Sequence, residues 1–135
     1  MTSSQSIAAS VVFGLGLGFA SVAWADSTSD ACVALANART ALYSMINAKD
    51  KSAQDAQNAK VQEASTKLES VLASVTGANA KAAADFKALW DQFKTTRDNQ
   101  IIPAIYKRNA DEAKKIADGI QFERLSKMWS IMSCR

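Results

Sequence analysis

Apolar residues recur at every third or fourth position along most of the chain, from about residue 30 to the C-terminus. This spacing places them on one face of an α-helix, and no sustained stretch alternates apolar and polar residues as a strand does. Residue types that favour helices, such as alanine, leucine, lysine, glutamine and glutamate, are frequent in the same region. The sequence therefore predicts an all-α protein.

Three short breaks divide this periodic region. In the first, Ser52 lies three residues before Asp55, a spacing typical of a helix-capping box. Gly77 in the second break suits the turn after a helix, and Asn109 in the third suits the cap of the helix that follows. The four helices expected from these breaks cover residues 30–48, 52–75, 79–107 and 110–134.

Connections of a few residues join the expected helices, and short connections make consecutive helices antiparallel neighbours. We therefore expect an antiparallel, up-down-up-down four-helix bundle. Pro103 lacks a backbone N–H, so we expect a kink in the third helix near Asn99 and Gln100. The residues expected to form the core are Leu35, Leu42, Met45, Ile46, Val61, Ala64, Leu68, Val71, Val75, Phe86, Leu89, Trp90, Phe93, Ile101, Ala104, Ala113, Ile116, Ile120, Met128 and Ile131.

The composition narrows the classes of function. The chain has 135 residues and no histidine, which excludes Ser-His-Asp and Cys-His catalysis, most zinc sites and His-ligated haem. We therefore expect a protein that is not an enzyme and carries no cofactor. The net charge is +3, but basic and acidic residues are interspersed, so no basic tract favours nucleic acid as a partner.

All charged residues lie after Ala25, and residues 7–25 form an uncharged, largely apolar run that ends in Ala-Trp-Ala. Small residues after an apolar run are typical of a secretory signal peptide. We expect cleavage after Ala25, which removes residues 1–25 and leaves residues 26–135 as an exported, periplasmic domain. The segment before the run has no lysine or arginine, and the run approaches the length of about 20 residues that spans a bilayer. Retention as a membrane anchor is therefore the alternative.

The chain has two cysteines, Cys32 and Cys134. In an up-and-down bundle of four helices, the start of the first helix and the end of the last lie at the same end. Because exported proteins fold in an oxidising compartment, we expect one disulfide between these residues. A metal or redox carrier that uses both cysteines with Met128 and Met132 is the alternative.

Three arginines fall on or beside the apolar faces of the expected helices. On a wheel of about 100° per residue, Arg97 lies on the face that carries Phe93, Arg124 lies on the face of the last helix, and Arg39 lies beside that of the first. Counted from the turns, all three lie within about two helical turns of one layer. Because guanidinium groups match carboxylate and phosphate oxygens, we expect Arg39, Arg97 and Arg124, with Thr96, to bind a small anionic ligand such as a carboxylate.

The alternative is that these arginines are structural. The carboxylates of Asp98, Glu123 and Glu69 lie at the edges of the apolar faces and can serve as internal partners. The bundle is then an interaction protein that forms a homodimer or docks on a membrane receptor. Trp129 lies off the apolar face of the last helix, which favours a self-association surface. Further hydrogen-bonding groups for a bound anion are Thr95, Ser65 and Gln121.

A longer motif spans the third and fourth expected helices. It reads Phe86-x-x-x-Trp90-x-x-Phe93-Lys94-x-Thr96-Arg97-Asp98-x-x-Ile101-Ile102-Pro103-Ala104-Ile105, followed by Asp111-Glu112-Ala113 and Gly119-Ile120-Gln121-x-x-Arg124. This stretch resembles the periplasmic four-helix-bundle sensor domain of methyl-accepting chemotaxis receptors. In that family the domain senses small molecules, commonly as a dimer, and signals through transmembrane helices. The sequence lacks a second transmembrane segment, so the resemblance implies a free-standing sensor-like module.

Overall fold

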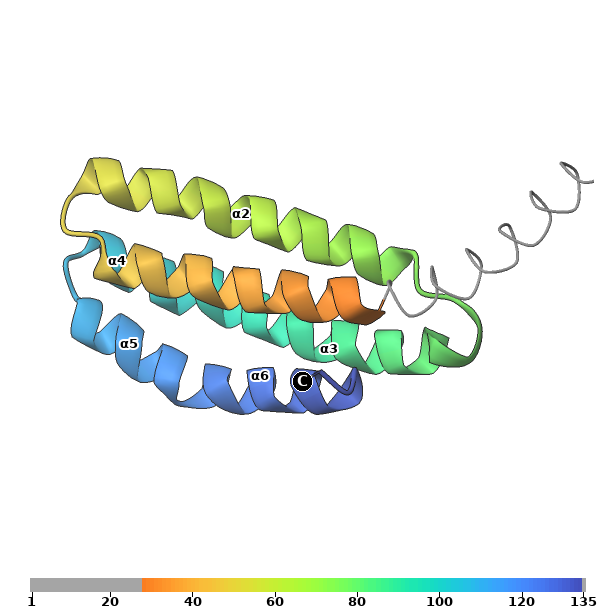
Figure 1. Ribbon diagram of the computed structural model, residues 1–135. Coiled ribbons are helices and arrows are strands. Elements are labelled where there is room, and N and C mark those ends of the chain that lie inside the picture. Colours follow the sequence, from red (N-terminus) through yellow and green to blue (C-terminus); the bar gives the residue numbers. More distant parts are fainter. Residues whose placement is uncertain (1–27, 135) are drawn as a thin grey trace, which may run out of the picture.

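The computed structural model describes residues 28–134, which form helices and contain no strand (Figure 1). The predicted all-α class and the division into four helices are confirmed. Within the described range, no helix has the length and hydropathy needed to cross a membrane. The expected signal peptide, residues 1–25, lies outside the described residues.

The four helices form four rods of similar length (Figure 1). The first helix is described over residues 28–47. The second rod is one unbroken α-helix, whereas the third and the fourth are each divided. The remaining elements are α2 (Lys51–Ala73), the 3-10 helix η1 (Gly77–Asn79), α3 (Ala80–Thr96), the π-helix η2 (Arg97–Ile101), α4 (Ile102–Tyr106), α5 (Ala110–Asp118) and α6 (Ile120–Ile131).

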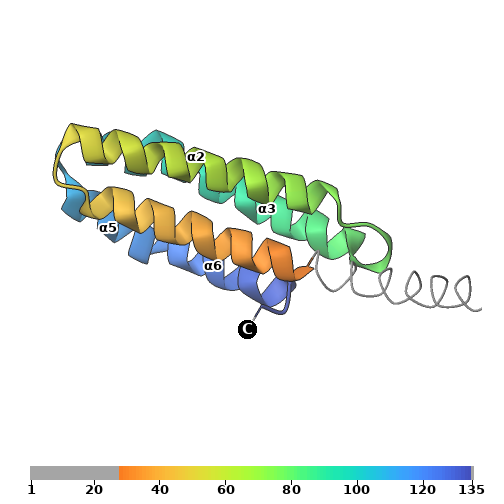
Figure 2. The same cartoon turned by 45° about the horizontal axis from the view of Figure 1, so that its top comes forward.

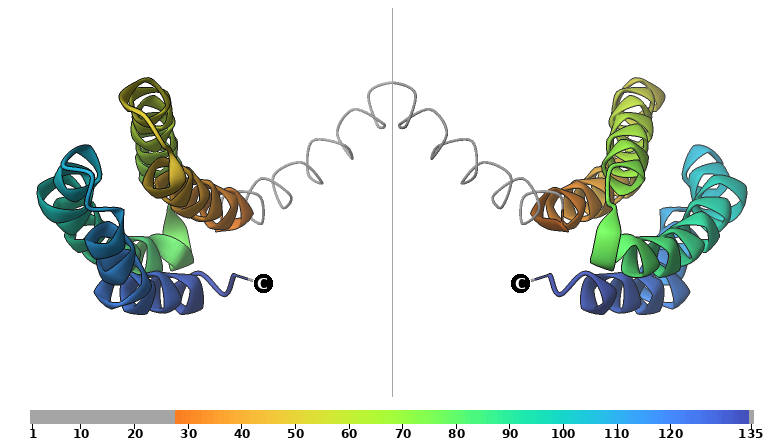
Figure 3. Two further views of the ribbon diagram at one scale, coloured as in Figure 1. Left: turned by 90° about the vertical axis from the view of Figure 1, so that its left-hand side faces the viewer. Right: turned by 90° about the vertical axis from the view of Figure 1, so that its right-hand side faces the viewer.

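Contacts between distant residues define which rods are neighbours. Tyr106 donates a hydrogen bond to Asp55, so the end of α4 lies beside the start of α2. Gln121 donates to the carbonyl of Phe93, so α6 lies beside α3. The views in Figures 2 and 3 place the first helix between α2 and α6, in agreement with the grooves that it lines with each of them.

The predicted disulfide is confirmed. The sulfurs of Cys32 and Cys134 are bonded, and the Cα atoms lie 5.6 Å apart. The bond joins the first helix to the segment that follows α6. It therefore holds together two rods that are far apart in the sequence.

The core contains most of the apolar positions that the spacing predicts. Its largest side chains include Trp90 and Phe93, whose rings stack with centroids 5.4 Å apart. All four rods contribute apolar side chains to it. The buried apolar residues are Ala31, Ala34, Leu35, Ala38, Ala41, Leu42, Met45, Ile46, Val61, Leu68, Leu72, Ala83, Phe86, Trp90, Phe93, Ile101, Ile105, Ala113, Ala117, Leu125, Met128 and Met132.

The kink expected in the third rod is the π-helix η2. There the N–H of Ile102 donates to the carbonyl of Arg97, five residues earlier, and Pro103 follows without an N–H to donate. A π-turn contains more residues than an α-turn, so the core face shifts by one position beyond it. Ile105 is buried as a result, and Ala104, which the sequence placed in the core, is only half-buried.

The fourth rod breaks at Gly119, where φ is −93° and ψ is −108°. A Cβ at this position would lie 3.0 Å from the carbonyl oxygen of Lys115, so only glycine fits without a shift. The inward face continues across the break, because Ala113, Ala117, Gln121 and Leu125 are buried at steps of four residues. Ile120 is 45% exposed, so its predicted place in the core is wrong.

The structure confirms one of the predicted helix caps and contradicts another. The predicted capping box at Ser52 is wrong, because Asp50 caps α2 and its carboxylate accepts a hydrogen bond from a first-turn N–H. Asn109 caps α5 as predicted and accepts from the N–H of Glu112. Gly77 has a φ of 69° and starts η1, a conformation that glycine adopts without strain.

Replacing Cys32 and Cys134 with serine is expected to lower the free energy of unfolding by about 3–5 kcal/mol, because the bond closes a long loop in the unfolded chain. The two cysteines are 102 residues apart in sequence. Urea denaturation of the oxidised wild type and the double variant measures the difference. Reduced wild type should unfold at the midpoint of the variant; equal midpoints for oxidised protein and variant would contradict the prediction.

Candidate functional site

Arg97 lies at the start of η2, and its side chain is almost fully buried. Its Nη1 donates to the hydroxyl of Ser65 on α2 at 2.5 Å, and its Nε donates to the carboxylate of Asp98 at 2.9 Å. Its Cζ lies 5.9 Å from the centre of the Trp90 ring. The guanidinium of this arginine therefore interacts with a carboxylate, a hydroxyl and an aromatic ring of the protein itself.

One nitrogen of this guanidinium, Nη2, is buried without a hydrogen-bond partner in the described part of the chain. A buried donor without a partner costs about 1–3 kcal/mol. The carboxylate of Asp98 is 45% exposed, so the ion pair is screened by solvent on one side. Arg97 thus joins α2 to η2 inside the bundle, and its charge is only partly compensated.

Arg124 and Thr96 lie together, because Nη1 of Arg124 donates to the hydroxyl of Thr96 at 2.7 Å. The same nitrogen donates to the side-chain oxygen of Gln121 at 2.9 Å. Gln121 is buried, and its amide donates to the carbonyl of Phe93 at 2.8 Å. These partners are neutral, and Arg124 forms no ion pair among residues 28–134.

Arg39 is exposed on the first helix and lies over the ring of Tyr43, with its Cζ 5.0 Å from the ring centre. It forms no direct ion pair with a carboxylate of the described residues, but its charge acts on the nearby carboxylate of Asp118. The nearby Asp118 accepts hydrogen bonds from Lys114 and from the Tyr43 hydroxyl. Those two bonds, with that of Lys114 contributing most, lower the pKa of Asp118. Burial and the bond to Asp118 raise the pKa of Tyr43.

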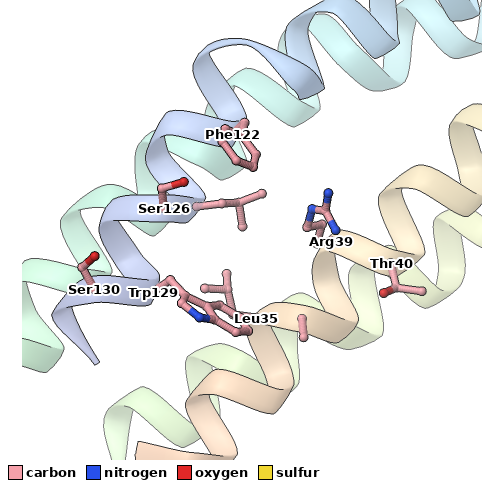
Figure 4. A pocket seen from close by; sticks show the side chains of 9 residues that line it. Leu35, Arg39, Thr40, Phe122, Ser126, Trp129 and Ser130 are labelled. Atoms are coloured by element: carbon pink, nitrogen blue, oxygen red, sulfur yellow. The ribbon is translucent and has the colours of Figure 1, made fainter. Parts of the chain in front are cut away.

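A groove of about 480 Å³ lies between the first helix and α6 (Figure 4). Figure 4 shows Leu35 and Arg39 on the first-helix wall, with Phe122 and Trp129 on the wall formed by α6. Arg39 is the one charged residue of the lining. We call this the Arg39 groove; its lining residues are Leu35, Ala36, Arg39, Thr40, Phe122, Leu125, Ser126, Trp129 and Ser130.

The walls of the Arg39 groove suit a ligand with a charged and an apolar part. Leu35, Phe122 and Trp129 offer apolar surface, and Phe122 is 51% exposed. The guanidinium offers paired donors that fit a carboxylate. Such a combination of apolar walls and one charged group is typical of small-molecule sites.

The three arginines expected at one anion site lie in three different surroundings. Arg97 is enclosed by Ser65 and Asp98, and Arg124 is bound to Thr96. Neither Arg97 nor Arg124 lines the Arg39 groove. Of the residues named from the sequence, only Arg39 offers its guanidinium to this groove.

The residues of the alternative metal or redox site are also accounted for. Met128 and Met132 are buried in the core, and both Cys32 and Cys134 are in the disulfide. Within the part of the chain that the structure describes, no group of three or more histidine, cysteine, aspartate or glutamate residues is placed to hold a metal ion. A carrier that works through free thiols is therefore disfavoured.

Sequence reasoning missed Phe122 and Leu35 as groove residues. The apolar spacing predicts Leu35 in the core, where it is buried, but this side chain also lines the groove. Phe122 lies outside the expected apolar face, and a large aromatic residue on a polar face was a signal for this site. Trp129 also lies off the expected apolar face, a position that predicts a self-association surface and not a groove.

The chain matches no protein-family model, no curated protein and no solved structure.

Changing Ser65 to alanine is expected to lower the free energy of unfolding by about 1–3 kcal/mol, because it leaves a second nitrogen of the buried Arg97 without a partner. In an Arg97→Met background the same change should cost less than about 1 kcal/mol, since no buried donor is left unpaired. Urea denaturation of the wild type, both single variants and the double variant gives this difference. Equal costs in the two backgrounds would contradict the assigned role of the hydrogen bond.

The Glu69 carboxylate is expected to make the stability of the fold depend on pH. Burial raises its pKa, but hydrogen bonds from Lys94 and Trp90 outweigh burial and lower the pKa below the ordinary value of 4.5. Because the folded pKa is below the unfolded one, Glu69 stabilises the fold above about pH 4.5, and this stability is lost as the pH falls through the folded pKa. Glu69→Gln should therefore lower Tm at pH 7 and have a smaller effect at pH 3. Thermal unfolding at both pH values tests this, and an equal Tm difference at both would be the opposite result.

Proposed function

We propose that this chain is an exported, non-enzymatic, sensor-like helical bundle that binds a small amphipathic anion between its first helix and α6. The proposal depends on one observation: Arg39 lies at an apolar groove and forms no direct ion pair among the described residues, although the charge of Asp118 acts on it at longer range. A carboxylate that binds there gains charge-assisted hydrogen bonds. Its apolar body gains further affinity by leaving water.

Arg39 suits a ligand better than Arg97 or Arg124. An anion that reached Arg97 would have to enter the core and compete with Ser65 and Asp98. Arg124 already uses Thr96 as an acceptor. Arg39 is exposed and stacks on Tyr43, so its guanidinium is held in place while an edge stays accessible to solvent.

The proposed architecture is the antiparallel, up-down-up-down bundle. Residue pairs between α2 and the third rod support it, because Asp55 contacts Tyr106 and Glu69 contacts Lys94. Residue numbers thus fall along one rod as they rise along the other. This arrangement also agrees with the resemblance of the third and fourth rods to the sensor domain of chemotaxis receptors.

Export to the periplasm is part of the same proposal. The disulfide supports it, because stable disulfides are typical of oxidising compartments. The uncharged leader and its Ala-Trp-Ala ending support it from the sequence.

A second candidate function is protein interaction. Val33 on the first helix and Ile120 and Phe122 on α6 are large apolar side chains with 45% to 56% exposure. Exposed apolar side chains on neighbouring helices favour a protein partner, either a second copy of the chain or a membrane receptor. This function predicts association that does not need a small molecule.

The binding proposal is tested with hexanoate as the probe, on protein purified from the periplasm with its disulfide intact. Hexanoate is expected to raise Tm with increasing concentration, because a ligand that binds the native state stabilises it. Arg39→Ala should weaken binding measured by titration calorimetry by about ten- to hundredfold, the value of hydrogen bonds to a charged group. The neutral hexanamide should bind wild type as weakly as hexanoate binds the variant.

Lys115→Ala is the matched control, since it removes one positive charge from an exposed position on α5 outside the groove. It should leave hexanoate affinity unchanged. No Tm shift with hexanoate, or equal affinities for wild type and Arg39→Ala, would overturn the binding proposal. Dimers that form at the same concentration with and without hexanoate would then favour the interaction function.

A further inference from the structure

A second groove, of about 460 Å³, lies at the disulfide end of the first helix and α6. It shares two lining residues, Ala36 and Trp129, with the Arg39 groove. The two grooves therefore meet at these side chains and follow the same pair of helices. We call the second one the disulfide groove; its lining residues are Thr28, Ser29, Cys32, Val33, Ala36, Trp129, Met132, Ser133 and Cys134.

Where the two grooves adjoin, the first helix contributes only a small side chain. Ala36 presents only a methyl group from the first helix, opposite the half-buried Trp129. A larger residue at Ala36 would add bulk between the two grooves. A ligand that occupies both grooves would run along the indole of Trp129 at this point.

Charge is distributed unequally along the joined grooves. Arg39 is the charged residue of the Arg39 groove, and the lining of the disulfide groove contains none. Its surface is formed by Val33, Met132, the disulfide sulfurs and several hydroxyl-bearing residues. A ligand that fits both grooves has one anionic end and a long uncharged body.

The length of the joined grooves sets the size of that body. Arg39 and Ser29 are ten residues apart on one helix, which corresponds to about 15 Å at 1.5 Å per residue. An extended alkyl chain with bonds of about 1.5 Å advances about 1.25 Å per carbon. About 12 carbons therefore cover the distance from Arg39 to the far end of the disulfide groove.

We infer that the ligand is an unbranched acyl-chain carboxylate, with its head at Arg39 and its chain running past Trp129 to the Cys32–Cys134 disulfide. This inference rests on the proposed function and specifies the ligand class of the same site. A compact aromatic acid would fill only the Arg39 groove. A peptide or a second copy would bring backbone or charged groups to a lining that has no charge beyond Arg39.

The test compares hexanoate, octanoate, decanoate and dodecanoate below their micelle concentrations, by titration calorimetry of the oxidised protein. Affinity is expected to rise by about fourfold for each added methylene and to stop rising beyond about 12 carbons. Ala36→Leu should remove the gain in affinity from hexanoate to dodecanoate, because the larger side chain fills the junction of the two grooves. Ala56→Leu, at an exposed position of α2 outside both grooves, is the matched control and should keep the gain.

Val33→Glu provides a second variant, because this exposed position tolerates a polar side chain. It puts a carboxylate beside the expected chain, so decanoate should bind less tightly while hexanoate is unaffected. If hexanoate binds through Arg39 but decanoate binds no more tightly, the inference fails and the proposed function stands. If Ala36→Leu and Val33→Glu both keep the full gain with chain length, the inference also fails. If no carboxylate binds, both fail.

Discussion

The disulfide between Cys32 and Cys134 is the constraint on which the rest of the structure depends. It ties the first helix to the end of α6, which are the two extremes of the described chain. The rods also share an apolar core, with side chains such as Trp90 and Phe93 at its centre. The seam between the first helix and α6 is held covalently, so its packing does not have to be complete. An unfilled seam can persist there, and both grooves lie in it.

A layer of buried polar side chains is a second constraint on how the helices pack. Ser65, Arg97 and Gln121 are buried on three different rods, and each is hydrogen-bonded. If α2 slid by one residue along η2, the guanidinium would lose its hydroxyl partner inside the core. Leaving a charged donor buried and unpaired is costly. The layer therefore penalises shifted arrangements of the helices more than an all-apolar core would.

The sequence predicts those parts of the molecule that follow from regular helical spacing. The helical class, most of the core and the disulfide are in this group. The error at Ala104 comes from η2, where the backbone departs from 3.6 residues per turn. The error at Ile120 comes from the centre chosen for the apolar face, because the buried positions run through Ala117 and Gln121. The candidate site was predicted less well, because a wheel gives the direction of Arg97 but not what its nitrogens reach. Phe122 could not be placed in a groove either, since a groove is the space that two helices together leave unfilled.

The positions of the tryptophans have an optical consequence. Trp90 is fully buried and stacked on Phe93, so the surroundings of its indole are fixed by the core. Trp129 is half-buried at the junction of the two grooves, where solvent reaches it. Among the described residues, the intrinsic fluorescence therefore divides into a blue-shifted component that is shielded from aqueous quenchers and a component that quenchers can reach. The second component responds to whatever occupies the seam, so the protein carries its own reporter of that surface.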